Sequence, residues 1–361
     1  MAENAPLVYL NTAACGRISD SVLQAGVRLY TQFENTASAT SEHWRDAEAP
    51  AIKNNIAGFM NTAPQDIALI PNFSYGLNAV VQALNGDEKV LLYRKDFPSV
   101  YIPFVINHFN IVWLDDEDGF LIDLHKIGDL IKTEKIDIVA ISHVQWHTGF
   151  KLDLKSLCSV CRSLGARTII DATQSLGAVD ISIPDVLPDV LIASNYKWMN
   201  AGFGTGILYM APEFATQYPP KVSGAHSNAF QFADGSFTRN TSVTNYEPGS
   251  VNMFGVSILN QAILEKQALG MEFIEQHNAA LTKQLTEGLA ALLVPIVGPA
   301  APDNRSSIVV LEDQNGLSAH LAAQNIIVTN RNGYIRLSVH FYNTETDIDR
   351  AVHCIRDWTK G

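Results

Sequence analysis

The sequence predicts an α/β fold in which helices cover a mostly parallel sheet. Five apolar runs do not alternate with polar residues, which is typical of strands that are buried on both faces of a parallel sheet. Helical stretches separate several of these runs, at residues 122–133 and 154–164, and this rhythm of strand and helix is typical of βαβ units. The five runs are Lys89–Tyr93, Ile111–Leu114, Ile136–Ile141, Thr168–Ile170 and Val190–Ala193.

The remaining elements follow in chain order. Residues 204–210 (GTGILYM) predict one further strand. The segment from about 219 to 252 is rich in Gly, Ser, Asn and Thr and predicts a long loop region. Two long helices are expected over about 256–277 and 279–292, followed by three candidate strands, SIVVLED, QNIIVTN and YIRLSVHFYN. A last helix is expected over about 345–359, because a capping residue and several acidic residues precede or open it.

The length of 361 residues is enough for two domains of roughly 150 residues each. The break in pattern after the loop region predicts a large domain over residues 16–252. A smaller C-terminal α/β domain is expected over residues 253–361, with residues 1–15 packed near it.

Composition narrows the function classes. A net charge of −12 with no basic stretch argues against binding to nucleic acid. No apolar run approaches the roughly 18–20 residues of a membrane span, and the N-terminus lacks the pattern of a secretory signal. We therefore expect a cytoplasmic protein with no membrane or nucleic-acid partner.

The four cysteines are too few for a disulfide scaffold. Cys158 and Cys161 form a C-x-x-C pair, but no second ligand pair follows at a spacing that would suit zinc. The pair lies inside an amphipathic stretch, so we interpret both residues as small apolar side chains on a helix and expect no metal site.

Two polar residues follow predicted strands and indicate chemistry. Asp171 ends a buried strand, and the carboxyl ends of parallel strands are where ligands bind. Lys197 follows the next predicted strand, among aromatic residues and glycines. A desolvated lysine is a competent nucleophile for a Schiff base, and a carboxylate can hold a pyridine nitrogen protonated. Together the two residues meet the requirements of pyridoxal phosphate, although Asp171 alone is equally compatible with a turn or a helix cap and Lys197 alone would be interpreted as a surface lysine.

Three segments carry a resemblance to a known family. DATQSLGAVDI, SNYKWMNAGFGTGILY and RLSVHFYNTETDID resemble the class V aminotransferase group of fold-type I pyridoxal phosphate enzymes. This group includes cysteine desulfurases, selenocysteine lyases, C–S lyases, kynureninases and isopenicillin N epimerase-like proteins. The resemblance runs from VYLNTAACG to YNTETDID and implies a large domain with a mostly parallel seven-stranded sheet, a smaller C-terminal domain and a homodimer with a shared active site.

The resemblance implies roles around the cofactor. Lys197 matches the Schiff-base lysine, Asp171 the partner of the pyridinium nitrogen and Gln174 the residue that hydrogen-bonds the phenolic oxygen. Further matches bind the phosphate or line the ring. The phosphate ligands implied are Phe73, Ser74, Ser194, Tyr196 and, from the partner subunit, Ser250, while Phe97, Gln145 and Trp146 are placed at the ring.

The resemblance also implies residues that contact the substrate. Arg336 matches the arginine that binds the substrate α-carboxylate, which suits a planar fork better than a lysine. Arg331 is expected to support the same end of the pocket or to bind a side-chain carboxylate. Asn11 and Cys15 fall in the N-terminal segment that approaches the site in the family, and Trp146 is counted among the substrate contacts.

The reaction is less defined than the cofactor. All these enzymes begin with Lys197 displaced from its aldimine and a quinonoid stabilised by Asp171. Phe97 stands where desulfurases carry a proton-transferring histidine, and the loop that carries their nucleophilic cysteine is absent between Arg331 and Arg336. We therefore expect first a C–S lyase that eliminates a β-substituent from cysteine or a derivative. The alternatives are an aminotransferase, a cysteine desulfurase, an epimerase-like or kynureninase-like enzyme, or a relative without turnover.

Overall fold

The computed structural model describes residues 6–231, 233–239 and 242–360. A seven-stranded sheet forms its centre, in the order β2 (Ile67–Ile70), β8 (Gly206–Met210), β7 (Val190–Ser194), β6 (Arg167–Asp171), β5 (Ile138–Ser142), β3 (Lys89–Tyr93) and β4 (Asn110–Leu114). The strands from β7 to β4 pair in parallel, and β8 is antiparallel to both of its neighbours. The predicted mostly parallel sheet is therefore confirmed.

Helices cover both faces of this sheet, which explains why its strands are continuously apolar. One face packs on α1 (Asp20–His43), α2 (Ala49–Phe59), α5 (Leu124–Glu134), α6 (Leu154–Ser163) and α9 (Met253–Leu269). The other face packs on α3 (Phe73–Ala83), α4 (Pro98–Ile106) and α8 (Pro212–Gln217). Within β3 the side chains alternate between the two cores, since Leu91 joins the first and Leu92 the second.

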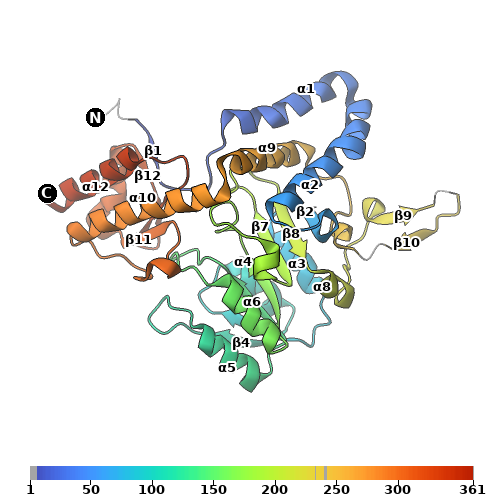
Figure 1. The fold of residues 1–361 in the computed structure, drawn as a ribbon, viewed down its shortest axis with the longest axis horizontal. Helices are drawn as coiled ribbons and strands as arrows, with labels where there is room; N and C mark the ends of the chain where they lie inside the picture. Colours follow the sequence, from blue (N-terminus) through green and yellow to red (C-terminus); the bar gives the residue numbers. More distant parts are fainter. Residues whose placement is uncertain (1–5, 232, 240–241, 361) are drawn as a thin grey trace.

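A second, smaller core lies around an antiparallel sheet of order β11 (Ile308–Glu312), β14 (Tyr334–Ser338) and β13 (Thr329–Arg331). The helices α10 (Met271–Ala291), α11 (Leu317–Ala323) and α12 (Glu345–Lys360) pack on it. The N-terminal strand β1 (Val8–Tyr9) pairs in parallel with β12 (Ile326–Ile327). Both ends of the described chain therefore lie in this C-terminal part (Figure 1).

The connection between the two cores differs from the prediction. A single helix was expected over about 256–277, but the chain breaks at Gly270, and α10 starts at Met271. Gly270 has φ +85°, a left-handed conformation that residues with a Cβ rarely adopt. The predicted boundary was wrong because periodicity continues across the glycine.

The expected loop region over 219–252 contains a short hairpin, β9 (Asn228–Phe230) with β10 (Phe237–Arg239). Figure 1 shows this hairpin projecting from the body of the large sheet. Short elements complete the chain: α7 (Ile183–Val186), the π-helical turn Trp44–Glu48 and several 3₁₀ turns.

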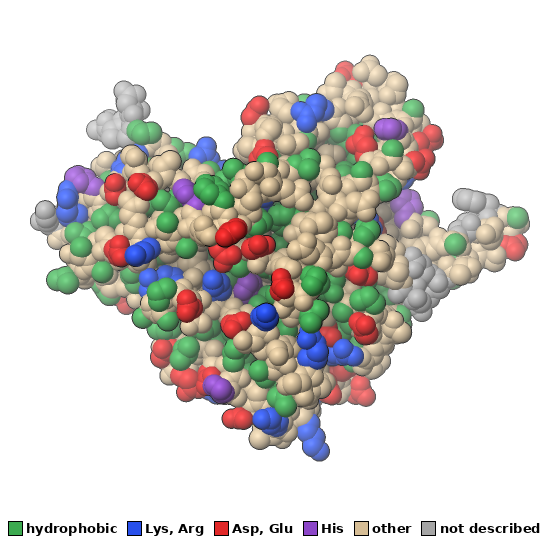
Figure 2. Space-filling view, viewed as in Figure 1, with side chains coloured by type: hydrophobic (Ala, Val, Ile, Leu, Met, Phe, Trp, Pro, Cys, Tyr) green, Lys and Arg blue, Asp and Glu red, His purple; other side chains and the backbone are tan. Residues whose placement is uncertain are grey.

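Two surface and composition features bear on the expected partners. Across the described ranges, none of the helices combines the length and the hydropathy needed to cross a bilayer. On the face drawn in Figure 2, acidic and basic side chains of the described residues are scattered among each other.

Cys158 and Cys161 lie buried in α6 as free thiols, as the helical interpretation of the C-x-x-C pair predicts.

Candidate active site

A cavity of about 550 Å³ lies at the carboxyl end of the parallel strands. β6 ends at Asp171 and β7 at Ser194, and both residues line it. Ligands bind at this edge in open α/β sheets because the strand ends and the first turns of the following helices converge there. Most of the predicted cofactor residues meet in this cavity: Phe73, Ser74, Phe97, Trp146, Asp171, Gln174, Ser194, Tyr196 and Lys197.

Lys197 and Asp171 are both buried, with 8% and 7% of their surfaces exposed. Burial lowers the pKa of Lys197, and the charge of Asp171 opposes that shift. Burial likewise raises the pKa of Asp171, although the Thr173 hydroxyl and backbone N–H, the latter 2.8 Å away, hydrogen-bond the carboxylate and counteract the rise. A lysine with a lowered pKa carries more of its neutral, nucleophilic form near neutral pH.

Backbone N–H and hydroxyl groups gather in one corner of the cavity, at the start of α3. Asn72 caps this helix through its side chain, and the backbone N–H of Phe73 donates to Ser194 Oγ over 2.8 Å. The Ser74 hydroxyl lies 3.0 Å from Ser99 Oγ. A helix N-terminus with hydroxyl groups beside it stabilises negative charge, because unpaired N–H groups and the helix dipole point at the ligand. Three of the predicted phosphate ligands, Phe73, Ser74 and Ser194, therefore lie at this corner, and their binding of a phosphate stays a prediction.

The walls between this corner and Lys197 are aromatic. The rings of Phe97 and Trp146 meet edge to face, with centroids 5.8 Å apart. Lys197 Nζ lies 5.7 Å from the Phe97 ring centroid and 5.5 Å from that of Tyr196. Phe203 stacks on Tyr196 at 4.5 Å and is largely exposed.

Two predicted glutamines differ in their placement. Gln174 lines the cavity, where its Oε1 accepts from Trp198 Nε1 over 2.7 Å and its Nε2 donates to the Ala13 carbonyl. Gln145 does not line it, because its Nε2 is directed to the Ser142 carbonyl at 3.2 Å and to Asp96 at 3.5 Å. Its part in cofactor binding stays a prediction.

Asp96 is a site residue that the sequence reasoning missed. Its carboxylate is buried and accepts from the Ser142 N–H at 2.8 Å and the Phe97 N–H at 2.7 Å. Burial raises the pKa of Asp96, and its charge also raises the pKa of Asp171. The available signal was an aspartate directly before Phe97, shortly after a predicted strand.

The two predicted arginines lie at a smaller adjoining pocket, which shares Trp146 with the main cavity. Arg336 is buried, and its Nη1 donates to the Trp146 carbonyl over 2.7 Å while its Nε has no hydrogen-bond partner among the described residues. Trp146 Nε1 is likewise buried without a partner in the described chain. Burial and the charge of Arg331 lower the pKa of Arg336 to about 10. Unpaired buried donors of this kind are satisfied when a carboxylate binds.

Arg331 lies over the indole of Trp146, 5.4 Å from its centroid. His147 packs edge to face on Tyr334 and also lines the arginine pocket. Burial and the charge of Arg336 lower the pKa of His147, which favours its neutral form.

The N-terminal segment closes against the loop of Lys197. The Gly16 N–H donates to the Tyr196 carbonyl over 2.8 Å, and a Cβ at Gly16 would lie 1.9 Å from the Lys197 carbonyl oxygen. Cys15 is half-buried and close enough to Lys197 for its pKa to respond to that charge. Asn11 instead bonds Thr329 and bridges to Ser338 of β14. This segment therefore spans both ends of the site.

Ser250 lies outside the main cavity of its own chain. It is exposed and lines a neighbouring cavity of about 350 Å³, which shares Pro71 and Gly204 with the main one. The contact of Ser250 with the phosphate of a partner subunit stays a prediction.

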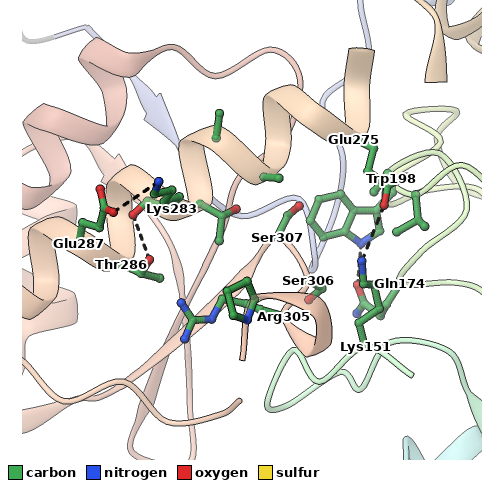
Figure 3. A pocket seen from close by; sticks show the side chains of 16 residues that line it. Lys151, Gln174, Trp198, Glu275, Lys283, Thr286, Glu287, Arg305, Ser306 and Ser307 are labelled. Carbon is green, nitrogen blue, oxygen red and sulfur yellow. Dashed lines mark hydrogen bonds and ion pairs between the residues drawn. The ribbon is translucent and has the colours of Figure 1, made fainter. Parts of the chain in front are cut away.

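A further cavity of about 470 Å³ lies behind the wall formed by Gln174 and Trp198 (Figure 3). Figure 3 shows the hydrogen bond between these two side chains at one end, Lys283, Thr286 and Glu287 of α10 at the other, and Arg305 between them. Arg305 directs its Nε and Nη2 to the Pro299 carbonyl, so its guanidinium anchors the loop before β11. Across the described residues, no cluster of three or more potential metal ligands is found.

The main cavity fits a ligand that combines an anionic group, an aromatic ring with a basic nitrogen and a carbonyl carbon. The α3 corner suits the anion, Phe97 suits the ring face, buried Asp171 suits the ring nitrogen and Lys197 suits the carbonyl. Pyridoxal phosphate has this combination. The residues present therefore fit the cofactor that the sequence predicts.

Comparisons with known proteins support the same assignment. A family described as Aminotransferase class-V matches residues 8–351. A probable cysteine desulfurase of Synechocystis sp. is 26% identical, and the match covers 95% of this chain and 89% of that protein. An uncharacterized aminotransferase of Bacillus subtilis, YcbU, is 22% identical over 96% of this chain and 94% of its own length.

Solved structures share the fold. The cystine C–S lyase C-DES in complex with cysteine persulfide has a TM-score of 0.88 at 20% identity, with 99% of this chain and 98% of that chain covered. A second C-DES structure carries glycine covalently linked to the pyridoxal phosphate cofactor. An apo cysteine desulfurase from Thermococcus onnurineus has a TM-score of 0.86 at 21% identity, with 98% and 95% covered. The predicted fold-type I architecture is confirmed, and the chain belongs to the class V aminotransferase family of pyridoxal phosphate-dependent enzymes.

Proposed function

We propose that the protein is a C–S lyase that eliminates the sulfur substituent of cysteine or a cysteine derivative. The observation that carries this proposal is the connection between Arg331 and Arg336. β13 ends at Arg331 and β14 begins at Tyr334, so only Asn332 and Gly333 join them, with φ +53° and φ +81°. Two left-handed residues form a tight hairpin turn, which leaves no mobile loop to carry a nucleophilic cysteine.

The other thiols support the same choice. Cys158 and Cys161 are buried in α6, where burial raises the pKa of each to about 12. Cys354 is buried in α12 of the small domain. Cys15 lies nearest to Lys197, but burial raises its pKa as well, and the thiolate is the form needed to accept sulfur. A β-elimination needs no enzyme thiol.

Each residue has a role in this chemistry. Bound pyridoxal phosphate supplies the electron sink that stabilises negative charge at the substrate Cα. Asp171 keeps the ring nitrogen protonated, which strengthens that sink. Arg336 binds the α-carboxylate through its unpaired Nε, and Lys197 Nζ takes the Cα proton, because its lowered pKa leaves it able to act as a base. The C–S bond then breaks, and the overall products are the thiol, pyruvate and ammonium, with one water consumed.

Arg331 extends the proposal to the substrate class. With Arg336 it places a second guanidinium at the same end of the site, each beside Trp146. A substrate whose leaving group also carries a carboxylate, such as cystine, complements both charges. Cystine is therefore the derivative that we expect to react with the lowest KM.

We further propose that the active unit is a homodimer with the shared site implied by exposed Ser250. Two exposed large hydrophobic side chains would be covered by such a partner: Phe203 of the main cavity, at 68% exposed, and Tyr75 of the neighbouring cavity that contains Ser250, at 41%. The division into domains over 16–252 and 253–361 and the cytoplasmic location also stay predictions.

The test is product analysis by mass spectrometry with purified enzyme and pyridoxal phosphate. The panel contains cysteine, cystine, an S-alkylcysteine, alanine and kynurenine. We expect pyruvate and ammonia in equal amounts from the sulfur amino acids, with none from the Lys197→Ala variant. Alanine formed from cysteine would instead identify a desulfurase. A keto acid that forms only with an added amino acceptor would identify an aminotransferase.

A further inference from the structure

A second lysine, Lys266 of α9, is more deeply buried than Lys197, with 1% of its surface exposed. Its Nζ donates to Asn200 Oδ1 over 2.9 Å and lies 4.5 Å from the centroid of the Phe341 ring. Among the described residues, Lys266 takes part in none of the ion pairs formed with carboxylates. A buried lysine without a carboxylate is costly, so its retention calls for a role in holding something else.

The fully buried His340 converges on the same asparagine. Its Nε2 lies 2.9 Å from Asn200 Oδ1 and 3.0 Å from the Trp198 carbonyl oxygen, and both of these are acceptors. Nε2 therefore carries the proton, while Nδ1 accepts from Asn278 Nδ2 over 3.3 Å. Burial lowers the pKa of His340, which keeps the ring in this neutral form. Lys266 and His340 thus donate together to one amide oxygen, although their nitrogens lie 3.3 Å apart.

The acceptors belong to the turn that carries Lys197. Asn200 has φ +58°, and its N–H donates to the Lys197 carbonyl over 3.1 Å. Its Nδ2 donates to the Arg17 carbonyl over 2.9 Å, on the N-terminal segment. Neither Lys266 nor His340 lines the cofactor cavity. Both act on the turn from behind, through Asn200 and the Trp198 carbonyl.

The network also reaches the substrate end of the site. His340 follows Arg336 by a few residues, and its N–H donates to Asn343 Oδ1 over 2.9 Å. The segment after β14 is therefore fixed to the same asparagine as the lysine turn.

We propose that Lys266 and His340 are positioning residues that hold the Lys197–Asn200 turn and tie it to the segment that follows Arg336. The inference rests on the proposed role of Lys197 as the cofactor-binding lysine. Hydrogen bonding to Asn200, rather than charge alone, is the contribution assigned to Lys266. Besides each other, the titratable groups whose charges act on Lys266 and His340 are Glu265 on α9 and His277 on α10.

The test compares Lys266→Met, which has no donor, with Lys266→Gln, which has a neutral N–H donor on a side chain of the same length as methionine. Lys283→Met on α10, an exposed lysine with 74% of its side chain accessible, is the matched control. The first readout uses enzyme without cofactor: the pH midpoint for acetylation of Lys197, measured by peptide mass spectrometry. The second is kcat/KM of the loaded enzyme.

We expect Lys266→Met to raise the labelling midpoint of Lys197, because a loosened turn admits water and relieves the desolvation that lowers its pKa. Its kcat/KM should fall by roughly 10- to 100-fold, as expected for a displaced catalytic group. Lys266→Gln should return both the labelling midpoint of Lys197 and kcat/KM most of the way to the wild-type values. The proposal is overturned if Lys266→Met melts at a lower temperature but keeps the wild-type midpoint and kcat/KM, or if Lys266→Gln behaves like Lys266→Met.

Two safeguards keep the result interpretable. If Lys266→Met does not fold by circular dichroism, His340→Leu and His340→Gln test the same turn from the other side, with the same expectation that only the glutamine restores it. Lys197→Ala is measured in parallel. If the covalent cofactor adduct of the wild-type enzyme does not map to Lys197, the proposed function fails, whatever result the Lys266 variants give.

Discussion

Two buried lysines lie on opposite sides of one turn, and their surroundings differ. Lys197 faces a cavity that contains the carboxylate of Asp171, whereas Lys266 faces an amide, an imidazole and an aromatic ring. Burial lowers the pKa of both. A lowered pKa therefore does not distinguish a nucleophile from a structural donor. The difference lies in access to a cavity and in a carboxylate that can serve a bound ligand.

The largest expected effect comes from Lys197→Ala, which tests which lysine binds the cofactor. The variant should lose both the covalent adduct that borohydride fixes and essentially all activity, because none of the other described residues that line the cavity carries an amine side chain. Peptide mass spectrometry locates the adduct. Lys266→Met should retain it at Lys197. An adduct on Lys266 in the wild-type enzyme would reverse the comparison.

Asp171→Asn tests the carboxylate that is present in the surroundings of Lys197 and absent from those described for Lys266. The neutral amide cannot hold the ring nitrogen protonated, so kcat should fall by about 10²- to 10³-fold, a loss typical of removing one preorganised electrostatic contact. Steady-state kinetics on the preferred sulfur amino acid give the number. The exposed Asp185→Asn on α7 serves as the control. Wild-type rates in Asp171→Asn would exclude the assigned role.

Arg336→Lys tests whether Arg336, which precedes the His340 segment in the chain, binds the substrate carboxylate. A lysine retains the charge but loses the planar fork, so KM should rise by roughly 10- to 100-fold, the worth of a hydrogen bond to a charged group. Arg94→Lys, at a half-exposed position paired with Asp115, controls for the substitution itself. An unchanged KM would place the carboxylate site elsewhere.

The smallest effect is on stability and its dependence on pH. Burial lowers the pKa of Lys266 to about 7, so between pH 7 and the unfolded value of about 10.4 the unfolded state binds more protons than the folded state. The wild-type protein should therefore gain stability from this group as pH rises across that window, by on the order of 1 to 3 kcal/mol.

Lys266→Met lacks this titration, so its stability relative to wild type should decline between pH 7 and pH 9.5. Urea unfolding at the two values measures the difference, and other titrating groups cancel in the comparison. A constant difference between the two proteins would mean that Lys266 does not change its protonation in this range.

Several features followed from the residues alone. The continuous apolar runs predicted a parallel sheet, because only strands covered on both faces need such runs. Asp171 and Lys197 could be paired in advance, since consecutive parallel strands end at the same edge. The family motifs then supplied the cofactor. The helix boundary at Gly270 was missed because hydrophobic periodicity does not report a left-handed φ.

Other features were decided only by the tertiary structure. Lys266 and His340 read in the sequence as ordinary members of helical and strand-end segments, and nothing local marks them as buried partners of Asn200. The position of Asp96 before Phe97 is visible in the sequence, but nothing local shows that its carboxylate also accepts from the N–H of Ser142, 46 residues further along the chain. Patterns in sequence record which face of an element is apolar, and so they determine the sheet and the location of its ligand edge. Contacts between distant polar groups depend on packing geometry across the chain, so only the folded structure shows that Lys266 and His340 meet at Asn200, behind the turn that carries Lys197.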